Sequence, residues 1–136
     1  MALKVTLKAN EHMIVGGAAV KNISGKSATL LIENEVPLLR EKEIMRDNEA
    51  DTPCKRIYLL TQLMYIDPAN LSRYHKLYWK LTGEIIEAAP STRGMFQAIS
   101  EQIYDNQYYH ALKEIRKLIQ YEQKATSNAL KSSRGI

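Results

Sequence analysis

The chain has 136 residues, of which 45% are hydrophobic and 25% are charged, and its formal net charge is +4. This composition is that of a soluble globular protein; it excludes a wholly disordered chain, and the length suits one domain or two small units. The single cysteine, Cys54, excludes an internal disulfide, and no apolar run approaches the roughly 18 residues of a membrane span. The amino terminus also lacks a secretion-signal pattern, so we expect a cytoplasmic protein without membrane contact.

The charge is unevenly distributed along the sequence. Residues 1–40 carry five Lys and Arg against three acids, residues 41–90 carry seven against eight, and residues 91–136 carry seven against four. The two basic ends are compatible with nucleic-acid binding, but the excess is smaller than that of most dedicated binders. From charge alone, an ordinary solvated surface is the simpler interpretation.

Residues 1–45 predict a small antiparallel β unit. Residues 3–8 alternate apolar and polar side chains, which indicates a half-buried strand with a basic outer face. Gly16-Gly17 and Ser24-Gly25-Lys26 are typical hairpin turns. Pro37 cannot donate to a β ladder, so the last strand is expected at a sheet edge. The predicted strands cover residues 3–8, 12–15, 18–23, 27–33 and 36–40, and together they make a meander or small barrel. The side chains expected to face inward are those of Leu3, Val5, Leu7, Ala28, Leu30 and Ile32.

Residues 46–125 predict a helical unit packed on the β unit, so the fold class is α+β. Thr52-Pro53 and Asp67-Pro68 each combine a capping residue with proline at the first helical position. Ser91 is expected to cap a third helix that ends near Tyr104, and a fourth helix follows to about residue 125. Residues 126–136 lack apolar periodicity and predict a mobile tail.

The sequence offers no catalytic or metal-binding constellation. Neither His12, His75 nor His110 has a histidine four residues on or a nearby cysteine pair, so we predict no metal and no cofactor. Cys54 is expected near a helix start, where the backbone amides lower the pKa of a thiol. Without a base beside it in the sequence, however, Cys54 is better interpreted as structural, and an enzyme is not expected.

Two sets of residues are candidates for binding. Tyr104, Tyr108 and Tyr109 lie near the start of the last predicted helix and are candidates for a protein interface, although bundle packing explains tyrosines at helical spacing equally well. Lys4 and Lys8 project from the outer face of the first strand, and Arg40 ends the last strand. If those two strands are neighbours, the three cations line one edge of the sheet and form a groove suited to single-stranded RNA.

The sequence resembles the FlbT family of flagellar regulators over about residues 3–124. The resemblance is carried by residues 39–44, by Thr52-Pro53 with Arg56-Ile57-Tyr58, by residues 62–68, and by residues 108–113 followed by Leu118, Ile119, Tyr121 and Glu122. It implies a cytoplasmic post-transcriptional regulator that acts on the 5′ untranslated region of flagellin mRNA and affects its translation and decay. It also implies a functional link to the small flagellin regulator FlaF.

A second, weaker resemblance covers residues 3–45, whose order of short strands is similar to the RNA-binding CsrA family. Lys8 and Arg40 stand where that family has RNA-contacting basic residues, whereas Leu7 stands in place of a second basic residue on the first strand. The resemblance implies direct RNA contact and an intertwined dimer. Coverage of the same sheet edges by the helices would instead leave a monomer or a heteromer.

Two functions from different classes therefore remain. In the first, the β unit binds the flagellin mRNA leader. In the second, the helical unit binds a protein partner, a FlaF-type regulator or flagellin, and RNA is affected indirectly. The steep salt dependence of phosphate contacts is the property that separates them.

Overall fold

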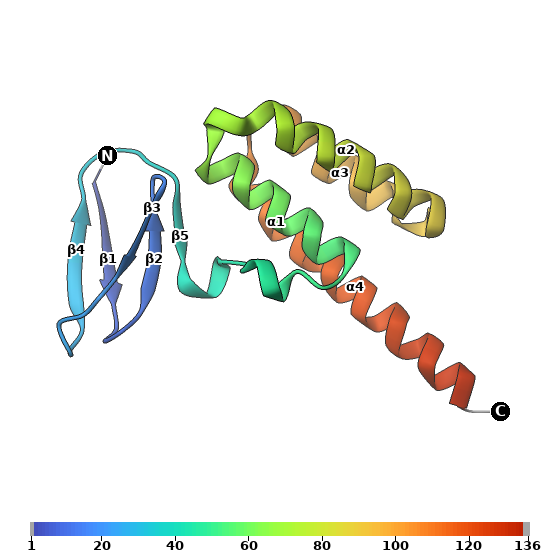
Figure 1. Ribbon diagram of the computed structural model, residues 1–136, viewed down its shortest axis with the longest axis horizontal. Helices are drawn as coiled ribbons and strands as arrows, with labels where there is room; N and C mark the ends of the chain where they lie inside the picture. Colours follow the sequence, from blue (N-terminus) through green and yellow to red (C-terminus); the bar gives the residue numbers. More distant parts are fainter. Residues whose placement is uncertain (1, 135–136) are drawn as a thin grey trace. The chain divides into compact units, whose positions relative to one another are not determined.

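The computed structural model describes the backbone of residues 2–134 and the side-chain surroundings of residues 2–128. It has the predicted α+β composition, with five antiparallel strands followed by four α-helices. The chain divides into two compact units, one ending at Ile44 and the other beginning at Met45 (Figure 1). Among residues 2–134, no helix combines the length and the apolar composition needed to cross a membrane.

The β unit consists of two small antiparallel sheets, whereas a meander or small barrel was predicted. The strands are β1 (Leu3–Leu7), β2 (His12–Val15), β3 (Ala18–Lys21), β4 (Ala28–Ile32) and β5 (Leu38–Arg40). β1 pairs with β4, and β2 pairs with both β3 and β5. The predicted edge position of the last strand is confirmed, because β5 ends the three-stranded sheet and begins directly after Pro37. The Pro37 carbonyl accepts a hydrogen bond from the Gly16 amide (2.8 Å) at the β2–β3 turn.

The core of the β unit follows the predicted alternation of β1 only in part. Val5 and Leu7 are buried with Met13, and Val15, Val20, Ile32 and Leu38 pack around them. Leu3 and Leu30, which were also predicted to face inward, are exposed. Leu30 lies opposite the buried Val5 across the β1–β4 ladder and Leu3 begins β1, so these two positions are outside the buried cluster that covers Val5 and Leu7.

The helical unit contains α1 (Pro53–Ile66), α2 (Leu71–Ala88), α3 (Arg93–Tyr104) and α4 (Tyr108–Arg134). α1 lies against α2 and α4, and α3 lies against α4. The predicted cap of α1 is confirmed, because the Thr52 hydroxyl accepts a hydrogen bond from the Lys55 amide (3.2 Å) and Pro53 occupies the first turn. The buried core is apolar and comes from all four helices, including Ile57, Tyr58, Met64, Tyr78, Phe96, Ile99, Ile103, Leu112, Ile115 and Leu118.

Three predicted helix boundaries were wrong. Asp67-Pro68 opens a single 3₁₀ turn (Pro68–Asn70), and α2 begins only at Leu71. Ser91 does not cap α3, because a second 3₁₀ turn (Pro90–Thr92) comes first and the Ser91 hydroxyl bonds the Tyr121 hydroxyl (2.7 Å). The backbone of α4 continues to Arg134, past the end predicted near residue 125. The last two residues of the predicted tail lie outside the described residues.

Candidate nucleic-acid interface

Two exposed lysines belong to β1 and its immediate end: Lys4 lies within the strand, and Lys8 is the first residue after it. Lys4 lies opposite Leu31 of β4, and Thr6 lies opposite Thr29, with their hydroxyl oxygens 3.4 Å apart. Burial of Val5 and Leu7 fixes the register, so the side chains between them point to the other face. Among residues 2–128, no acidic side chain forms an ion pair with Lys4 or Lys8. Both ammonium groups are therefore available to an anion.

Arg40 is held against β1 by its side chain. One guanidinium nitrogen (Nη2) donates a hydrogen bond to the Thr6 carbonyl (2.7 Å), and the Arg40 amide donates to the Glu43 carboxylate (2.9 Å). The guanidinium has five N–H donors in one plane, so one bond to Thr6 leaves donors for a further contact. Its planar shape also suits phosphate binding and stacking on bases.

The condition that the first and last strands are paired neighbours is not met, because β1 pairs with β4 and β5 pairs with β2. The Arg40 side chain nevertheless crosses from β5 to the backbone of β1. It meets that strand at Thr6, between Lys4 and Lys8 in the sequence. Arg40 is thus joined to β1 through a side-chain contact and not through a shared ladder.

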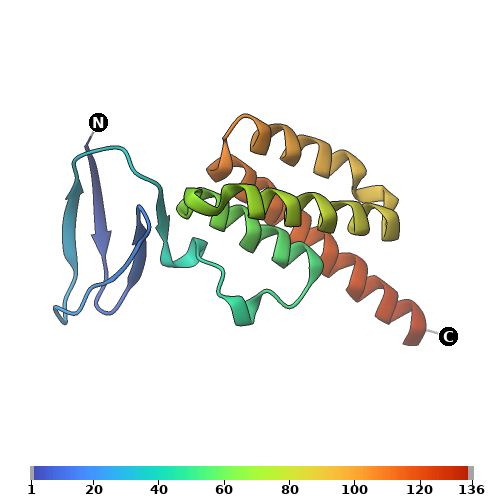
Figure 2. The same cartoon turned by 45° about the horizontal axis from the view of Figure 1, so that its top comes forward.

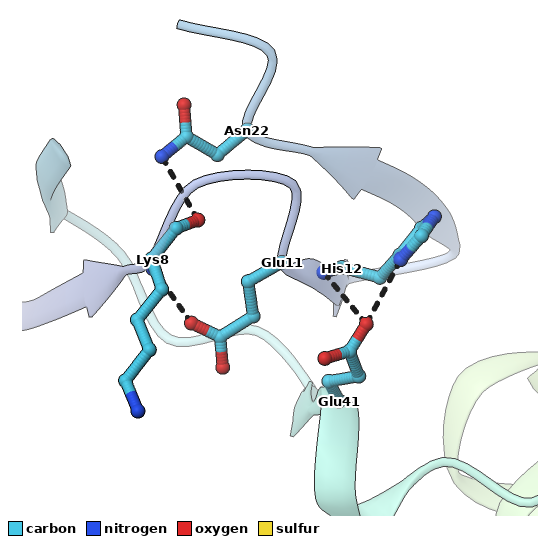
Figure 3. A network of polar contacts seen from close by, with 5 residues as sticks. All are labelled: Lys8, Glu11, His12, Asn22 and Glu41. Atoms are coloured by element: carbon cyan, nitrogen blue, oxygen red, sulfur yellow. Dashed lines mark hydrogen bonds and ion pairs between the residues drawn. The ribbon is translucent and has the colours of Figure 1, made fainter. Parts of the chain in front are cut away.

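The corner after β1 is organised by Asn22, which is 8% exposed. Its amide nitrogen lies within hydrogen-bond distance of three carbonyl oxygens, those of Leu7 (3.0 Å), Lys8 (3.0 Å) and Lys26 (2.8 Å). The Lys8 amide donates to the Glu11 carboxylate (2.7 Å), as Figure 3 shows. These contacts fix the backbone of Lys8 and leave its ammonium group outside the network. Sequence reasoning missed Asn22 because a buried asparagine within a turn gives no pattern of its own.

A second polar contact joins β2 to the segment after β5. The His12 ring nitrogen Nδ1 lies 2.9 Å from the Glu41 carboxylate, and the His12 amide donates to the same oxygen atom (3.3 Å) (Figure 3). Glu41 directly follows Arg40, so this contact anchors the chain at the point where the guanidinium turns toward β1.

The three candidate tyrosines have different surroundings. Tyr104 is 85% exposed. Tyr108 is half-buried, its hydroxyl donates to the Asn106 side chain (3.1 Å), and burial raises its pKa. Tyr109 is also half-buried, with its ring centroid 6.2 Å from that of Tyr65 and the Lys113 ammonium 4.8 Å above it. Tyr104 alone of the three presents most of its side chain to solvent. Sequence reasoning did not single out Trp79, which is 51% exposed on α2.

Cys54 is not arranged as a nucleophile. It is 3% exposed, and burial together with the neighbouring Glu122 carboxylate raises its pKa to about 12. The lowering of the pKa that a helix start can produce is outweighed here, since both of these effects disfavour the thiolate. No group of three His, Cys, Asp or Glu side chains capable of holding a metal occurs among the described residues.

Several residues of the motifs that carry the FlbT resemblance form hydrogen bonds between different segments of the helical unit. The Glu122 carboxylate of α4 accepts hydrogen bonds from the Thr52 hydroxyl (2.5 Å) and the Cys54 amide (3.2 Å) at the start of α1. The buried Gln62 side chain bonds both the amide (2.7 Å) and the carbonyl (3.0 Å) of Met45. These motif residues stabilise the fold and are not candidates for ligand binding.

Comparison with known proteins decides the family. The family model described as "Flagellar protein FlbT" matches residues 3–126. The chain belongs to the FlbT family. The resemblance inferred from the motifs is thereby confirmed. The comparison with solved structures gave no significant match.

Curated FlbT relatives span most of this chain. The probable flagellum biosynthesis repressor protein FlbT 1 of Bradyrhizobium diazoefficiens is 42% identical over 124 residues, which cover 91% of this chain and 84% of that protein. The corresponding protein of Rhodopseudomonas palustris is 40% identical and is covered over 99% of its length. The flagellum biosynthesis repressor protein FlbT of Caulobacter vibrioides is 32% identical, over 90% of this chain and 87% of that protein.

Proposed function

We propose that this FlbT-family protein is a cytoplasmic post-transcriptional regulator, not an enzyme, that binds the 5′ untranslated region of flagellin mRNA and alters its translation or decay. The names of its relatives, flagellum biosynthesis repressors, support a regulatory role in flagellar synthesis. The RNA contact is assigned to Lys4, Lys8 and Arg40 of the β unit. Exposed cations beside a polar strand face suit a single-stranded leader.

The observation that carries this proposal is the hydrogen bond from the Arg40 guanidinium to the Thr6 carbonyl. This bond joins a planar, permanently charged group to β1 at Thr6, which lies between Lys4 and Lys8 in the sequence. The two lysines are four residues apart, which is roughly 13 Å along a strand. They are therefore too far apart to share one phosphate and would bind separate nucleotides, with Arg40 between them.

Reversing the two lysine charges is expected to weaken RNA binding by about 100-fold, roughly tenfold for each lost phosphate contact. The variant is Lys4→Glu with Lys8→Glu, and the measurement is fluorescence anisotropy of a labelled flagellin leader RNA at low salt. Both side chains are exposed, so the fold is expected to survive the change.

The matched control carries the same two charge reversals on the exposed residues Lys76 and Lys80 of α2. Its dissociation constant for the RNA is expected to lie within a factor of about three of the wild-type value, because only the long-range electrostatic attraction changes. Equal weakening by both double variants would show that RNA responds to net charge alone and would exclude a site on β1.

A second candidate function is that the helical unit binds a protein partner, a FlaF-type regulator or flagellin, and so affects the mRNA indirectly. The exposure of Tyr104 favours this possibility, because large exposed aromatic side chains are common anchors of protein interfaces. Co-expression and co-purification with each of these two proteins tests it. If neither co-purifies with the wild-type chain, this candidate is excluded.

A further inference from the structure

A groove of about 650 Å³ lies between α2 and α3 in the helical unit. Its apolar lining includes Trp79 and Ile86 of α2 together with Phe96 and Tyr104 of α3. Phe96 is buried, whereas Trp79 and Tyr104 are among the most exposed large side chains of the unit. The groove therefore has an apolar lining that includes two solvent-exposed aromatic side chains, Trp79 and Tyr104.

The helix packing explains why the groove is open. α2 packs on α1 and α3 packs on α4, and both α2 and α3 contact the turn Pro90–Thr92 that connects them. Figure 2 separates these two helices, which overlap in Figure 1. The Tyr78 hydroxyl of α2 and the Ser100 hydroxyl of α3 are 2.9 Å apart and hydrogen-bonded. Ser100 also lines the groove, so this contact joins the two helices beside it.

The rim of the groove carries opposite charges at its two ends. Arg93 begins α3, whereas Glu101 and Asp105 lie at its other end, and all three line the groove. Arg93 and Glu101 are eight residues apart, which is roughly 12 Å along a helix. None of the three forms an ion pair with another residue in the range 2–128. They are therefore available to charges of a bound partner.

We propose that this groove binds one amphipathic α-helix of a partner protein, with an acidic side chain opposite Arg93 and a basic side chain opposite Glu101 and Asp105. α3 has 12 residues, so the matching segment has about three turns, and its apolar side chains at i, i+4 and i+7 enter the groove. The opposite charges at the two ends fix the direction of the bound helix. This inference rests on the second candidate function for the existence of a partner and is independent of RNA binding by the β unit.

Trp79 is the only tryptophan of the chain, so its fluorescence reports occupancy of the groove. The probes are three synthetic 15-residue helical peptides with one shared apolar stripe. The first has Glu at one end and Lys at the other, the second has Glu at both ends, and the third has Lys at both ends. We expect a saturable blue shift of Trp79 fluorescence with the first peptide and about fivefold weaker binding of the other two.

Charge changes in the protein test the charge complementarity directly. Arg93→Glu makes the whole rim acidic and is expected to make the peptide with two Lys ends the tightest binder. Arg73→Glu, an equal change at an exposed position of α2 outside the groove, is expected to leave the order unchanged. Equal affinity of wild-type protein for all three peptides, or no saturable shift up to about 200 µM, would overturn the proposal.

Truncation of the exposed Tyr104 side chain is the second test of peptide binding to the groove. Tyr104→Ala is expected to weaken binding of the first peptide about tenfold. Leu77→Ala, at an exposed position of α2 outside the groove, is expected to leave peptide binding unchanged. Trp79 fluorescence could instead respond to single-stranded RNA, or to self-association of the protein at higher concentration, and not to the peptides. Either result would assign the groove to another occupant and overturn the proposal. Peptide binding without co-purification of FlaF or flagellin would exclude those two partners but not the helix-binding groove.

Discussion

Replacing Asn22 by Asp is expected to unfold the β unit and leave the helical unit folded. The amide nitrogen of Asn22 donates to a cluster of three carbonyls, and its oxygen accepts from the amide (3.0 Å) and hydroxyl (2.8 Å) of Ser24. A carboxylate cannot donate these bonds and places negative charge against the carbonyl oxygens. The loss is about 3 kcal/mol or more, because buried carbonyls lose their partners.

A unit of this size has little stability to lose. At roughly 0.1 kcal/mol per residue, 44 residues contribute about 4 kcal/mol of unfolding free energy. Hydrogen exchange of the full chain provides the measurement. We expect amides of residues 3–44 to lose protection in the Asn22→Asp variant and those of residues 45–128 to keep it. The control is Asn34→Asp, the same change at an exposed turn residue. Full protection of residues 3–44 in the Asn22 variant would contradict this account of the corner.

The thiol of native Cys54 is expected to react with a disulfide reagent at pH 8 about 1,000-fold more slowly than the thiol of the urea-unfolded chain. The pKa of Cys54 rises from the ordinary value of 9.0 to about 12, and the thiolate is the reactive form. Three pH units correspond to roughly a thousandfold lower thiolate fraction, and burial slows the reaction further. A cysteine introduced at the exposed residue Ser127, in a Cys54→Ala background, is the positive control and is expected to react fast.

The same pKa shift predicts that the chain loses stability at high pH. The unfolded thiol loses its proton near pH 9, whereas the folded thiol keeps it to about pH 12. The folded state therefore binds more protons in this window, and its stability falls as the pH rises, by up to about 1.4 kcal/mol per unit. The Cys54→Ala variant is expected to lose this contribution, which urea unfolding at pH 8 and pH 10 can measure. An equal pH dependence in both proteins would contradict the assignment to Cys54.

The sequence predicted the strands of the β unit well and their pairing poorly. Alternation and turn residues depend on local preferences, and these placed all five strands close to their observed positions. Pairing depends on which strands bury their apolar faces together, and the return of β4 to β1 leaves no local signal. The exposure of Leu3 and Leu30 has the same origin, since alternation predicts a face but not what covers it.

The candidate site was predictable to a similar degree. Lys4 and Lys8 follow from the alternation of β1, and Arg40 was identified by its position at the end of the last strand. The contact between Arg40 and Thr6 was not predictable in detail, because it joins residues 34 positions apart through a side chain. Trp79 was missed because it lies beside the apolar stripe of α2, and periodicity identifies buried residues more readily than exposed ones.

A salt titration of flagellin leader RNA binding tests the central claim most directly. Three phosphate contacts predict that the logarithm of the association constant falls with the logarithm of salt concentration with a slope of about −2, at roughly 0.7 per contact. The variant with Glu at positions 4 and 8 is predicted to bind with a slope shallower by about 1.4. No saturable binding by the wild-type chain at about 50 mM salt, or an identical slope for the wild type and the variant, would contradict RNA recognition by Lys4, Lys8 and Arg40.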